Sequence, residues 1–382
     1  MMQNLHDRDF NRMKRLVRRM FTPFEQVLLS LLLATAMWTA AHGQSLSEST
    51  DINLIQFWSQ EPNGWNYPIA ISVPAGDAPL DGFPVGVILH GNNGNGPAML
   101  NLGQALLSNH ILVAPTGYLN SWNLCGESSE APDIAMLADL IEQLLAFDNV
   151  HAEHIRLIGF SNGAGLVNQG FIELESSAID VFVAIVSQMN EPQFHQGAFH
   201  RPSGLTVPSV AFCGYDEVVL PPMGRKYLSI CNHNDSIVPY SGGPAVGNVF
   251  LPAEVSIHQV AVQQGHVGPP VLGDDLNVPG LTEFSYLDGD VVLLRGGAGH
   301  GTNPSELEFA AAFLAIDDSP DPPTSGCIED LNNDSLVGVA DVLIMLGEFG
   351  CSTDCNSDVN GDDGVNVSDL LQMISAFGNI CN

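Results

Sequence analysis

Residues 159–163 (GFSNG) place Ser161 between two glycines, in the spacing G-x-S-x-G. A strand-like apolar run precedes this segment at 155–160, and a helix-like run follows it at 164–174. A strand-to-helix turn this tight requires glycine at both flanks, because a Cβ there would clash with neighbouring backbone. Such a turn lifts the Ser161 hydroxyl clear of the sheet edge, where it could act as a nucleophile.

A serine hydroxyl needs a base to remove its proton, and the base needs a carboxylate to orient it. In chains with this motif the acid and the histidine follow the serine in that order. His300 is the candidate base because it lies in the glycine-rich segment 296–301 (GGAGHG), between a strand-like run and a helix-like run. His266 is the reserve. Asp235 and Asp216 each follow a strand-like run, and position alone does not separate these two candidates for the acid.

Residues 90–96 (HGNNGNG) directly follow another strand-like run. A tetrahedral acyl intermediate needs N–H donors aimed at its oxyanion, and one such donor is worth about 3–4 kcal/mol. The backbone N–H of Asn92 is one candidate donor. The N–H of Asn162, the residue after the nucleophile, is the other.

Nearly continuous apolar runs alternate with helical patterns over most of the chain. Runs of this kind are typical of strands buried on both faces of a parallel sheet. We expect strands at 84–90, 111–115, 155–160, 181–187, 207–213, 226–231 and 290–295, and helices at 133–147 and 305–316. The predicted fold class is α/β, a mostly parallel sheet flanked by helices.

The N-terminal residues 1–43 combine several basic residues with an apolar run at 27–41 and a small-residue ending. The run is shorter than the roughly 20 apolar residues that span a bilayer. It therefore predicts a secretory signal, cut before Gln44, and a secreted protein; an uncleaved anchor is the alternative.

The charge balance is strongly acidic, with 11 Lys+Arg against 43 Asp+Glu and a net charge of −32. Such a surface repels nucleic acid and anionic lipid and favours cation binding. We therefore expect no nucleic-acid or membrane partner.

Residues 317–326 (DDSPDPPTSG) predict a linker between a large domain, 44–316, and a small one, 327–382. The small domain repeats a D-x-N-x-D pattern twice, each copy followed by an apolar helical run, at 342–349 and 370–377. Calcium takes six to eight oxygen ligands, and this spacing can supply them. The predicted calcium ligands are Asp330, Asn332, Asp334, Leu336 and Asp341 in one loop, and Asp358, Asn360, Asp362, Gly364 and Asp369 in the other.

All seven cysteines follow the predicted signal, in a compartment where disulfides form. The repeat suggests one clasp per unit, Cys327–Cys351 and Cys355–Cys381. The three remaining cysteines are an odd number, so one of their thiols is unpaired or pairs elsewhere.

The segments 87–96, 117–122 (GYLNSW), 155–165, 234–243 (NDSIVPYSGG) and the GAGH loop occur in the order found in secreted poly(3-hydroxybutyrate) depolymerases and feruloyl or acetylxylan esterases. The resemblance covers roughly residues 84–315 and implies an α/β-hydrolase fold with a Ser-His-Asp triad. Its D-x-x-V-P-Y-x-G-G segment favours Asp235 over Asp216 as the acid. It also implies that Trp122 is an aromatic residue of the substrate site.

The C-terminal repeats resemble type I dockerin repeats, which implies a small all-α calcium-loop domain and a cohesin-like scaffold as candidate partner. Together these patterns predict a secreted serine esterase acting on feruloyl or acetyl esters of polysaccharide, or on polyhydroxyalkanoate. Calcium is the one expected cofactor, with none needed for catalysis. A non-catalytic binding protein with a hydrolase fold, assembled through the repeats, is the alternative from another class. A peptidase with the same triad is a further one.

Overall fold

A computed structural model describes residues 44–204, 212–315, 328–332, 337–351, 355–360 and 364–377. The chain divides into two compact units between Ala315 and Ile316, and each is described by itself. The predicted signal and linker lie outside the described residues.

The larger unit is built on a nine-stranded sheet in the order β14-β15-β16-β11-β7-β6-β4-β5-β3. Its strands are β3 (Ile69–Ser72), β4 (Phe83–Leu89), β5 (Ile111–Pro115), β6 (Val150–Phe160), β7 (Ile179–Ile185), β11 (Lys226–Asn232), β14 (Asp274–Asp275), β15 (Thr282–Tyr286) and β16 (Val291–Gly296). The six strands from β5 to β16 are parallel, and β3 and β15 flank them antiparallel. The continuous apolar runs are therefore the buried parallel strands, as predicted.

The structure describes only residues 212 and 213 of the strand predicted at 207–213, and these two residues do not form a strand. Residues 205–211 lie outside the description, and the described residues 212 and 213 belong to a turn. Cys213 has a φ of 53° and forms a disulfide with Cys125, and this left-handed backbone is incompatible with a strand.

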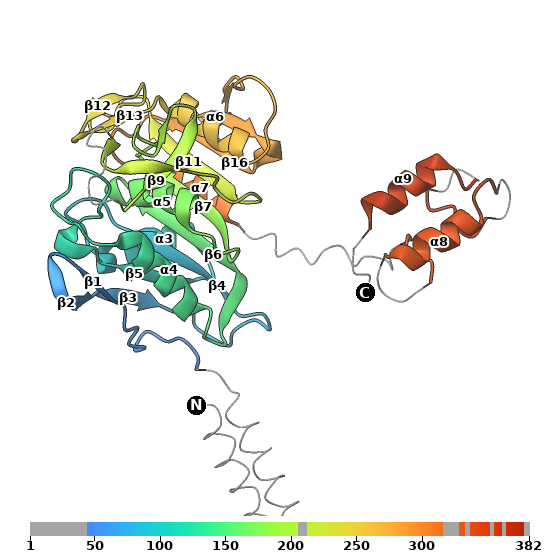
Figure 1. Ribbon diagram of the computed structural model, residues 1–382, viewed down its shortest axis with the longest axis horizontal. Coiled ribbons are helices and arrows are strands. Elements are labelled where there is room, and N and C mark those ends of the chain that lie inside the picture. Colours follow the sequence, from blue (N-terminus) through green and yellow to red (C-terminus); the bar gives the residue numbers. More distant parts are fainter. Residues whose placement is uncertain are drawn as a thin grey trace, which may run out of the picture. The chain divides into compact units, whose positions relative to one another are not determined.

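Helices cover both faces of the sheet (Figure 1). They are α3 (Gly96–Leu106), α4 (Asp133–Leu144), α5 (Asn162–Glu173), α6 (Ala253–Gln263) and α7 (Pro304–Leu314). Alternate side chains of β4 enter two separate cores: Val87 and Leu89 pack with α4, α5 and α6, whereas Ile88 packs with α3 and α7. This division explains why the central strands have no polar face.

Short elements, which the sequence patterns did not predict, surround this sheet. They are the ribbon β1 (Ile55–Trp58) and β2 (Glu61–Asn66), the small sheet β8 (Phe194–His195), β9 (Ala198–Pro202) and β10 (Tyr215–Val219), the ribbon β12 (Gly243–Ala245) and β13 (Asn248–Phe250), and the 3₁₀ turns η1 (Tyr118–Asn120) and η3 (Leu287–Gly289). The mixed sheet, its two helical layers and the turn between β6 and α5 define an α/β-hydrolase fold. Within the described part of the chain, no helix has the length and apolar character needed to cross a bilayer.

The C-terminal unit contains the helices α8 (Val339–Gly347) and α9 (Val367–Ser375), in line with the two predicted helical runs. Its small core contains Val337, Met345, Val359, Val365 and Met373. A core of this size is small for independent stability, so cross-links and ligands matter here.

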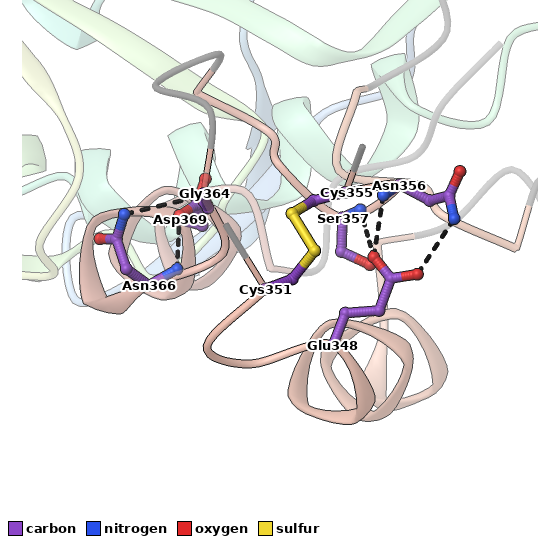
Figure 2. The surroundings of a disulfide bond; sticks show 8 residues. All are labelled: Glu348, Cys351, Cys355, Asn356, Ser357, Gly364, Asn366 and Asp369. Atoms are coloured by element: carbon purple, nitrogen blue, oxygen red, sulfur yellow. Dashed lines mark hydrogen bonds between the residues drawn. A yellow bond between two sulfur atoms is a disulfide. The ribbon is translucent and has the colours of Figure 1, made fainter. Parts of the chain in front are cut away.

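The disulfide found among the described residues of this unit differs from the prediction. Cys351 is bonded to Cys355, with 5.9 Å between their Cα atoms (Figure 2). The two cysteines lie four residues apart in the segment that joins the repeats, and Glu348 closes the same segment by accepting hydrogen bonds from Asn356 and Ser357. The pairs Cys327–Cys351 and Cys355–Cys381 are therefore wrong, since Cys351 and Cys355 are each other's partners. Cys327 and Cys381 lie outside the described residues.

Candidate active site

Ser161 lies at the turn between β6 and α5, with a φ of 54° and a ψ of −116°. Non-glycine residues rarely adopt positive φ, and such strain concentrates at functional sites. A Cβ on Gly159 would lie 2.2 Å from the Gly163 carbonyl oxygen, and a Cβ on Gly163 would lie 2.5 Å from the Leu89 oxygen. Glycine is thus required at both flanks, as the motif predicts.

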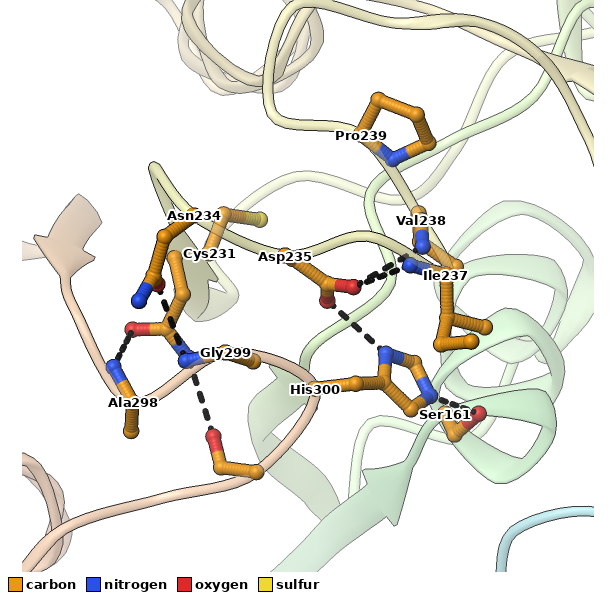
Figure 3. A network of polar contacts seen from close by, with 12 residues as sticks. Ser161, Cys231, Asn234, Asp235, Ile237, Val238, Pro239, Ala298, Gly299 and His300 are labelled. Carbon is orange, nitrogen blue, oxygen red and sulfur yellow. Dashed lines mark hydrogen bonds and ion pairs between the residues drawn. The ribbon is translucent and has the colours of Figure 1, made fainter.

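The structure brings Ser161, His300 and Asp235 together in one chain of hydrogen bonds (Figure 3). The Ser161 Oγ lies 2.7 Å from His300 Nε2, and His300 Nδ1 lies 2.8 Å from Asp235 Oδ2. The Asp235 side chain is only 2% exposed. In this geometry Nδ1–H donates to the carboxylate, which leaves Nε2 to accept the serine proton.

The backbone around Asp235 fixes its carboxylate. Its Oδ1 accepts hydrogen bonds from the N–H groups of Ile237 (2.8 Å) and Val238 (3.0 Å), which leaves Oδ2 for His300. The rival Asp216 lies on β10, in a separate small sheet, and the reserve base His266 packs against Tyr286. Neither of these two lines the cleft around Ser161.

Two asparagines that the sequence analysis did not single out hold the His300 loop. Asn232 Nδ2 donates to the carbonyl oxygens of Gly299 and Gly301, and Asn234 Oδ1 accepts from the Gly299 N–H. Both come from the segment that also carries Asp235. Their closeness to Asp235 in sequence was the available signal, because one short loop positions both the acid and the histidine.

The two predicted oxyanion donors line the same cleft as Ser161. Asn162 is the first residue of α5, where a backbone N–H has no intrahelical acceptor. The segment before Asn92 passes against the nucleophile, since a Cβ on Gly91 would lie 3.3 Å from the Ser161 Cβ. Among the residues that the structure describes, neither the Asn92 nor the Asn162 N–H has a protein acceptor.

Trp122 is not a substrate-site aromatic. Its side chain is 0% exposed and does not line the cleft. The indole Nε1 donates a 2.7 Å hydrogen bond to the His90 carbonyl oxygen, and the two rings lie 4.7 Å apart. A buried indole needs such a partner for its N–H, so Trp122 supports the oxyanion loop from behind.

The cleft has a volume of about 640 Å³. Apolar side chains such as Leu119, Leu124 and Phe250 line it alongside many uncharged hydrogen-bonding side chains. The latter are Asn92, Asn93, Ser121, Asn162, Ser128, Ser129, Gln188, Asn190 and Asn248. No Lys or Arg is among the described lining residues. The lining therefore combines apolar surface with uncharged hydrogen-bonding groups and suits an uncharged substrate.

Glu127, also absent from the predictions, is the carboxylate that lines this cleft. Its Oε2 accepts hydrogen bonds from the Leu124 and Cys125 N–H groups, and its Oε1 accepts one from Asn162 Nδ2. The Cys125–Cys213 disulfide anchors the same loop.

Cys231 is the thiol that stays unpaired in the larger unit, and it is buried. Desolvation raises its pKa to about 12, so the thiol is protonated at neutral pH. It donates a weak hydrogen bond to Gln188 Oε1, which lies 3.5 Å away. Cys231 therefore packs behind the cleft and has no chemical role there.

Asp341 and Asp369, at position 12 of the predicted calcium loops, are fully buried at the starts of α8 and α9. The Asp341 carboxylate accepts from Asn332 N (3.1 Å) and Gly338 N (2.8 Å). Asp369 makes the matching bonds in the second repeat.

Each loop therefore folds back onto a buried carboxylate. Of the other predicted ligands, Asp330, Asn332, Asp358, Asn360 and Gly364 are described, whereas Asp334, Leu336 and Asp362 lie outside the described residues. Within the described part of the chain, no three His, Cys, Asp or Glu side chains come together as a metal site.

Comparison with known proteins finds no matching family model and no matching curated protein. Solved structures that resemble the chain include an acetyl xylan esterase from Aspergillus awamori, at 13% identity and a TM-score of 0.43, covering 65% of this chain and 94% of that one. A Bacillus cereus carboxylesterase matches at 13% identity and a TM-score of 0.41, covering 65% of this chain and 93% of that one. Acyl-protein thioesterase 2 from Zea mays matches at 15% identity and a TM-score of 0.38, covering 65% of this chain and 99% of that one. Likeness this weak carries no argument about activity.

Proposed function

We propose that this chain is a secreted serine esterase that hydrolyses carboxylic esters on an extracellular polymer. The observation that carries the proposal is the hydrogen-bond chain from Asp235 through His300 to Ser161, which ends at a serine held in a left-handed backbone conformation. A base and an orienting acid arranged in this way are what a serine nucleophile requires.

The reaction follows from these positions. Ser161 Oγ attacks the acyl carbon while its proton passes to His300 Nε2, and the carbonyl electrons move onto the oxygen. The N–H groups of Asn92 and Asn162 stabilise that oxyanion. The intermediate collapses, the ester C–O bond breaks, and His300 returns the proton to the leaving alcohol. Water, activated by the same His300, then releases the acid from Ser161.

The lining of the cleft supports a polysaccharide ester over a polyhydroxyalkanoate. Its amide and hydroxyl side chains can exchange hydrogen bonds with sugar hydroxyls, whereas a polyhydroxyalkanoate offers ester oxygens as acceptors and few donors. We therefore place acetyl or feruloyl esters of a polysaccharide first among the substrates.

For the C-terminal unit we propose calcium binding in both repeats. The predicted oxygen ligands fit calcium by chemistry, since each loop combines carboxylates, an amide and a backbone carbonyl. Asp341 and Asp369 also support the fit, because each is a buried carboxylate at position 12 of its loop, where calcium takes a carboxylate ligand. We also propose that this unit docks to a cohesin-like scaffold, and that residues 1–43 direct secretion.

Calcium binding is tested in the full chain by differential scanning calorimetry with excess calcium and with excess chelator. We expect the transition of the C-terminal unit to rise with calcium, since a ligand at 100 times its Kd stabilises by about 2.7 kcal/mol. Asp341→Ala combined with Asp369→Ala should abolish the shift. A transition that calcium leaves unchanged in the native chain would contradict the proposal.

Esterase activity is tested by hydrolysis of p-nitrophenyl acetate by the chain lacking residues 1–43. Ser161→Ala should abolish turnover. Ser285→Ala, at an exposed serine of β15 that does not line the cleft, should retain it. No turnover of p-nitrophenyl acetate or of acetylated and feruloylated polysaccharide by folded native protein would favour the non-catalytic binding protein instead.

A further inference from the structure

A second cleft, of about 690 Å³, lies next to the segment that carries Asp235. Its polar lining consists of His233, Tyr240, Asp275, Thr282 and Arg295. Arg295 stands near the carboxyl end of the parallel strand β16, where ligands of open α/β sheets commonly bind. The triad uses none of these side chains.

Arg295 differs from the other basic residues after residue 43, each of which is already neutralised or saturated. Three are in ion pairs, and the fourth donates to backbone carbonyls: Arg156 pairs with Asp180, Arg201 with Glu217, Lys226 with Asp290, and Arg225 bonds to the oxygens of Phe171, Leu174 and Ser176. Within the described part of the chain, Arg295 has no ion pair. Its link to a carboxylate is indirect, because the Thr282 hydroxyl lies between Arg295 and Asp275.

The contacts of Arg295 fix the position of its guanidinium and leave several of its N–H groups able to bind a ligand. One nitrogen, Nη2, donates to Thr282 Oγ1 at 2.9 Å, and the group lies 5.6 Å from the Phe284 ring centroid. The Thr282 hydroxyl in turn donates to Asp275 Oδ1 at 2.8 Å, which holds that exposed carboxylate. A guanidinium has five N–H donors in a planar fork that matches a carboxylate.

His233 adds a second polar group to the same cleft. Its ring Nδ1 lies 2.7 Å from the Gly296 carbonyl oxygen, so Nδ1 carries the donated proton and Nε2 remains for another partner. Arg295 on β16 and His233 just after the neighbouring β11 therefore offer the groups that recognise an anion or a sugar hydroxyl.

The linings of the two clefts come close to each other along the chain. Val238 lines the catalytic cleft and Tyr240 lines the second, so only two residues of chain, at most about 7 Å between their Cα atoms, separate the two linings. An oligosaccharide is longer than this separation. The catalytic cleft contains Glu127 and no basic residue in its described lining, whereas the second cleft holds Arg295 as well as Asp275, so a negative group is better placed in the second cleft.

We propose that the Arg295 cleft binds a carboxylate of the substrate, which makes the preferred substrate an ester of an acidic, uronate-containing polysaccharide. This proposal rests on the proposed esterase function. The neutral ester group occupies the cleft at Ser161, and a uronate further along the chain meets Arg295. The net charge of −32 repels polyanions at long range. At 0.15 M salt the Debye length is about 8 Å, so this long-range repulsion is largely screened while the direct contact with Arg295 is not.

The test uses the full chain with Ser161→Ala, so that binding is measured without turnover. Isothermal titration at about 0.15 M NaCl compares trigalacturonate with the neutral xylotriose. We expect the acidic trisaccharide to bind about tenfold more tightly, and Arg295→Gln to remove that difference. Arg201→Gln, which removes a cation from the small sheet, should leave it intact.

Equal affinity for the two trisaccharides, or an unchanged preference in Arg295→Gln, would overturn the proposal. If circular dichroism shows that Arg295→Gln does not fold, Arg295→Lys takes its place. Lysine keeps the charge but lacks the planar fork, so the acidic trisaccharide should bind several-fold more weakly while the binding of xylotriose is unaffected. Unchanged binding of both trisaccharides would again overturn the proposal. Loss of p-nitrophenyl ester turnover, by contrast, bears on the proposed esterase function alone.

Discussion

The side-chain oxygen of Asn162 accepts a 2.7 Å hydrogen bond from the backbone N–H of Trp122. Its amide nitrogen donates to the Trp122 carbonyl oxygen and to Glu127 Oε1. The residue directly after Ser161 therefore fastens the neighbouring loop to the nucleophile turn. Its backbone N–H faces the proposed oxyanion while its side chain positions the wall of the cleft.

Asn162→Ala should lower kcat/KM by about tenfold, although the backbone N–H remains. The substitution leaves the Trp122 N–H without its acceptor, which costs about 1–3 kcal/mol for a buried group, and the loop shifts. Steady-state kinetics with a p-nitrophenyl ester measures the effect. Asn101→Ala, at an exposed position of α3, is the matched control and should leave activity unchanged. Full activity in Asn162→Ala would show that the loop holds without it.

Asp235→Asn should reduce kcat by about 10⁴-fold, the size of effect known for the orienting acid of such triads. The amide can no longer hold the His300 ring in the tautomer that accepts the serine proton. Asp216→Asn removes the rival acid and should change kcat less than twofold, because Asp216 lies on β10 and does not line the catalytic cleft. A larger loss in Asp216→Asn than in Asp235→Asn would reverse the assignment.

Gly163→Ala should destabilise the larger unit by about 2–3 kcal/mol, the upper range for overpacking. The new Cβ would lie 2.5 Å from the Leu89 carbonyl oxygen, and backbone cannot move aside as a flexible side chain can. Gly347→Ala meets nothing within 4 Å and serves as the control. Thermal unfolding followed by circular dichroism compares them; equal melting temperatures would mean that the turn tolerates a methyl group.

Local patterns predicted much of this site. The strand, the glycines and the turn at Ser161 are adjacent in sequence, and their requirements are steric, so the motif fixes the local backbone. The parallel strands were also predictable, because burial on both faces leaves continuous apolar runs. His300 followed from chain order, but the choice between Asp235 and Asp216 needed family resemblance.

Features that depend on distant packing were not predictable. Trp122 is buried because the His90 carbonyl oxygen, 32 residues away in sequence, accepts its indole N–H, and no local pattern signals this partner. Glu127 enters the cleft through backbone bonds of its own loop. The Cys351–Cys355 bond likewise reflects how the segment between the repeats turns, whereas sequence symmetry suggested one clasp per repeat.

A buried carboxylate behind the cleft should make stability depend on pH. Asp133 accepts hydrogen bonds from Tyr67 Oη (2.9 Å) and the Asn123 N–H (2.7 Å). Burial raises its pKa from near 4 to about 7, with those hydrogen bonds opposing the shift. The folded state therefore binds a proton that the unfolded chain releases. The contribution of Asp133 to stability is fully present below about pH 4 and is lost as the pH rises to about 7.

Asp133→Asn mimics the protonated acid and should flatten this dependence. At 1.36 kcal/mol per pKa unit, the variant should gain on the order of 4 kcal/mol relative to the native chain between about pH 4 and pH 7. Urea unfolding at several pH values measures the difference. Asp139→Asn removes a carboxylate from the exposed face of the same helix and controls for the change in net charge. Parallel pH profiles for Asp133→Asn and the native chain would mean that Asp133 stays ionised in the folded protein, with its two hydrogen bonds outweighing the cost of burial.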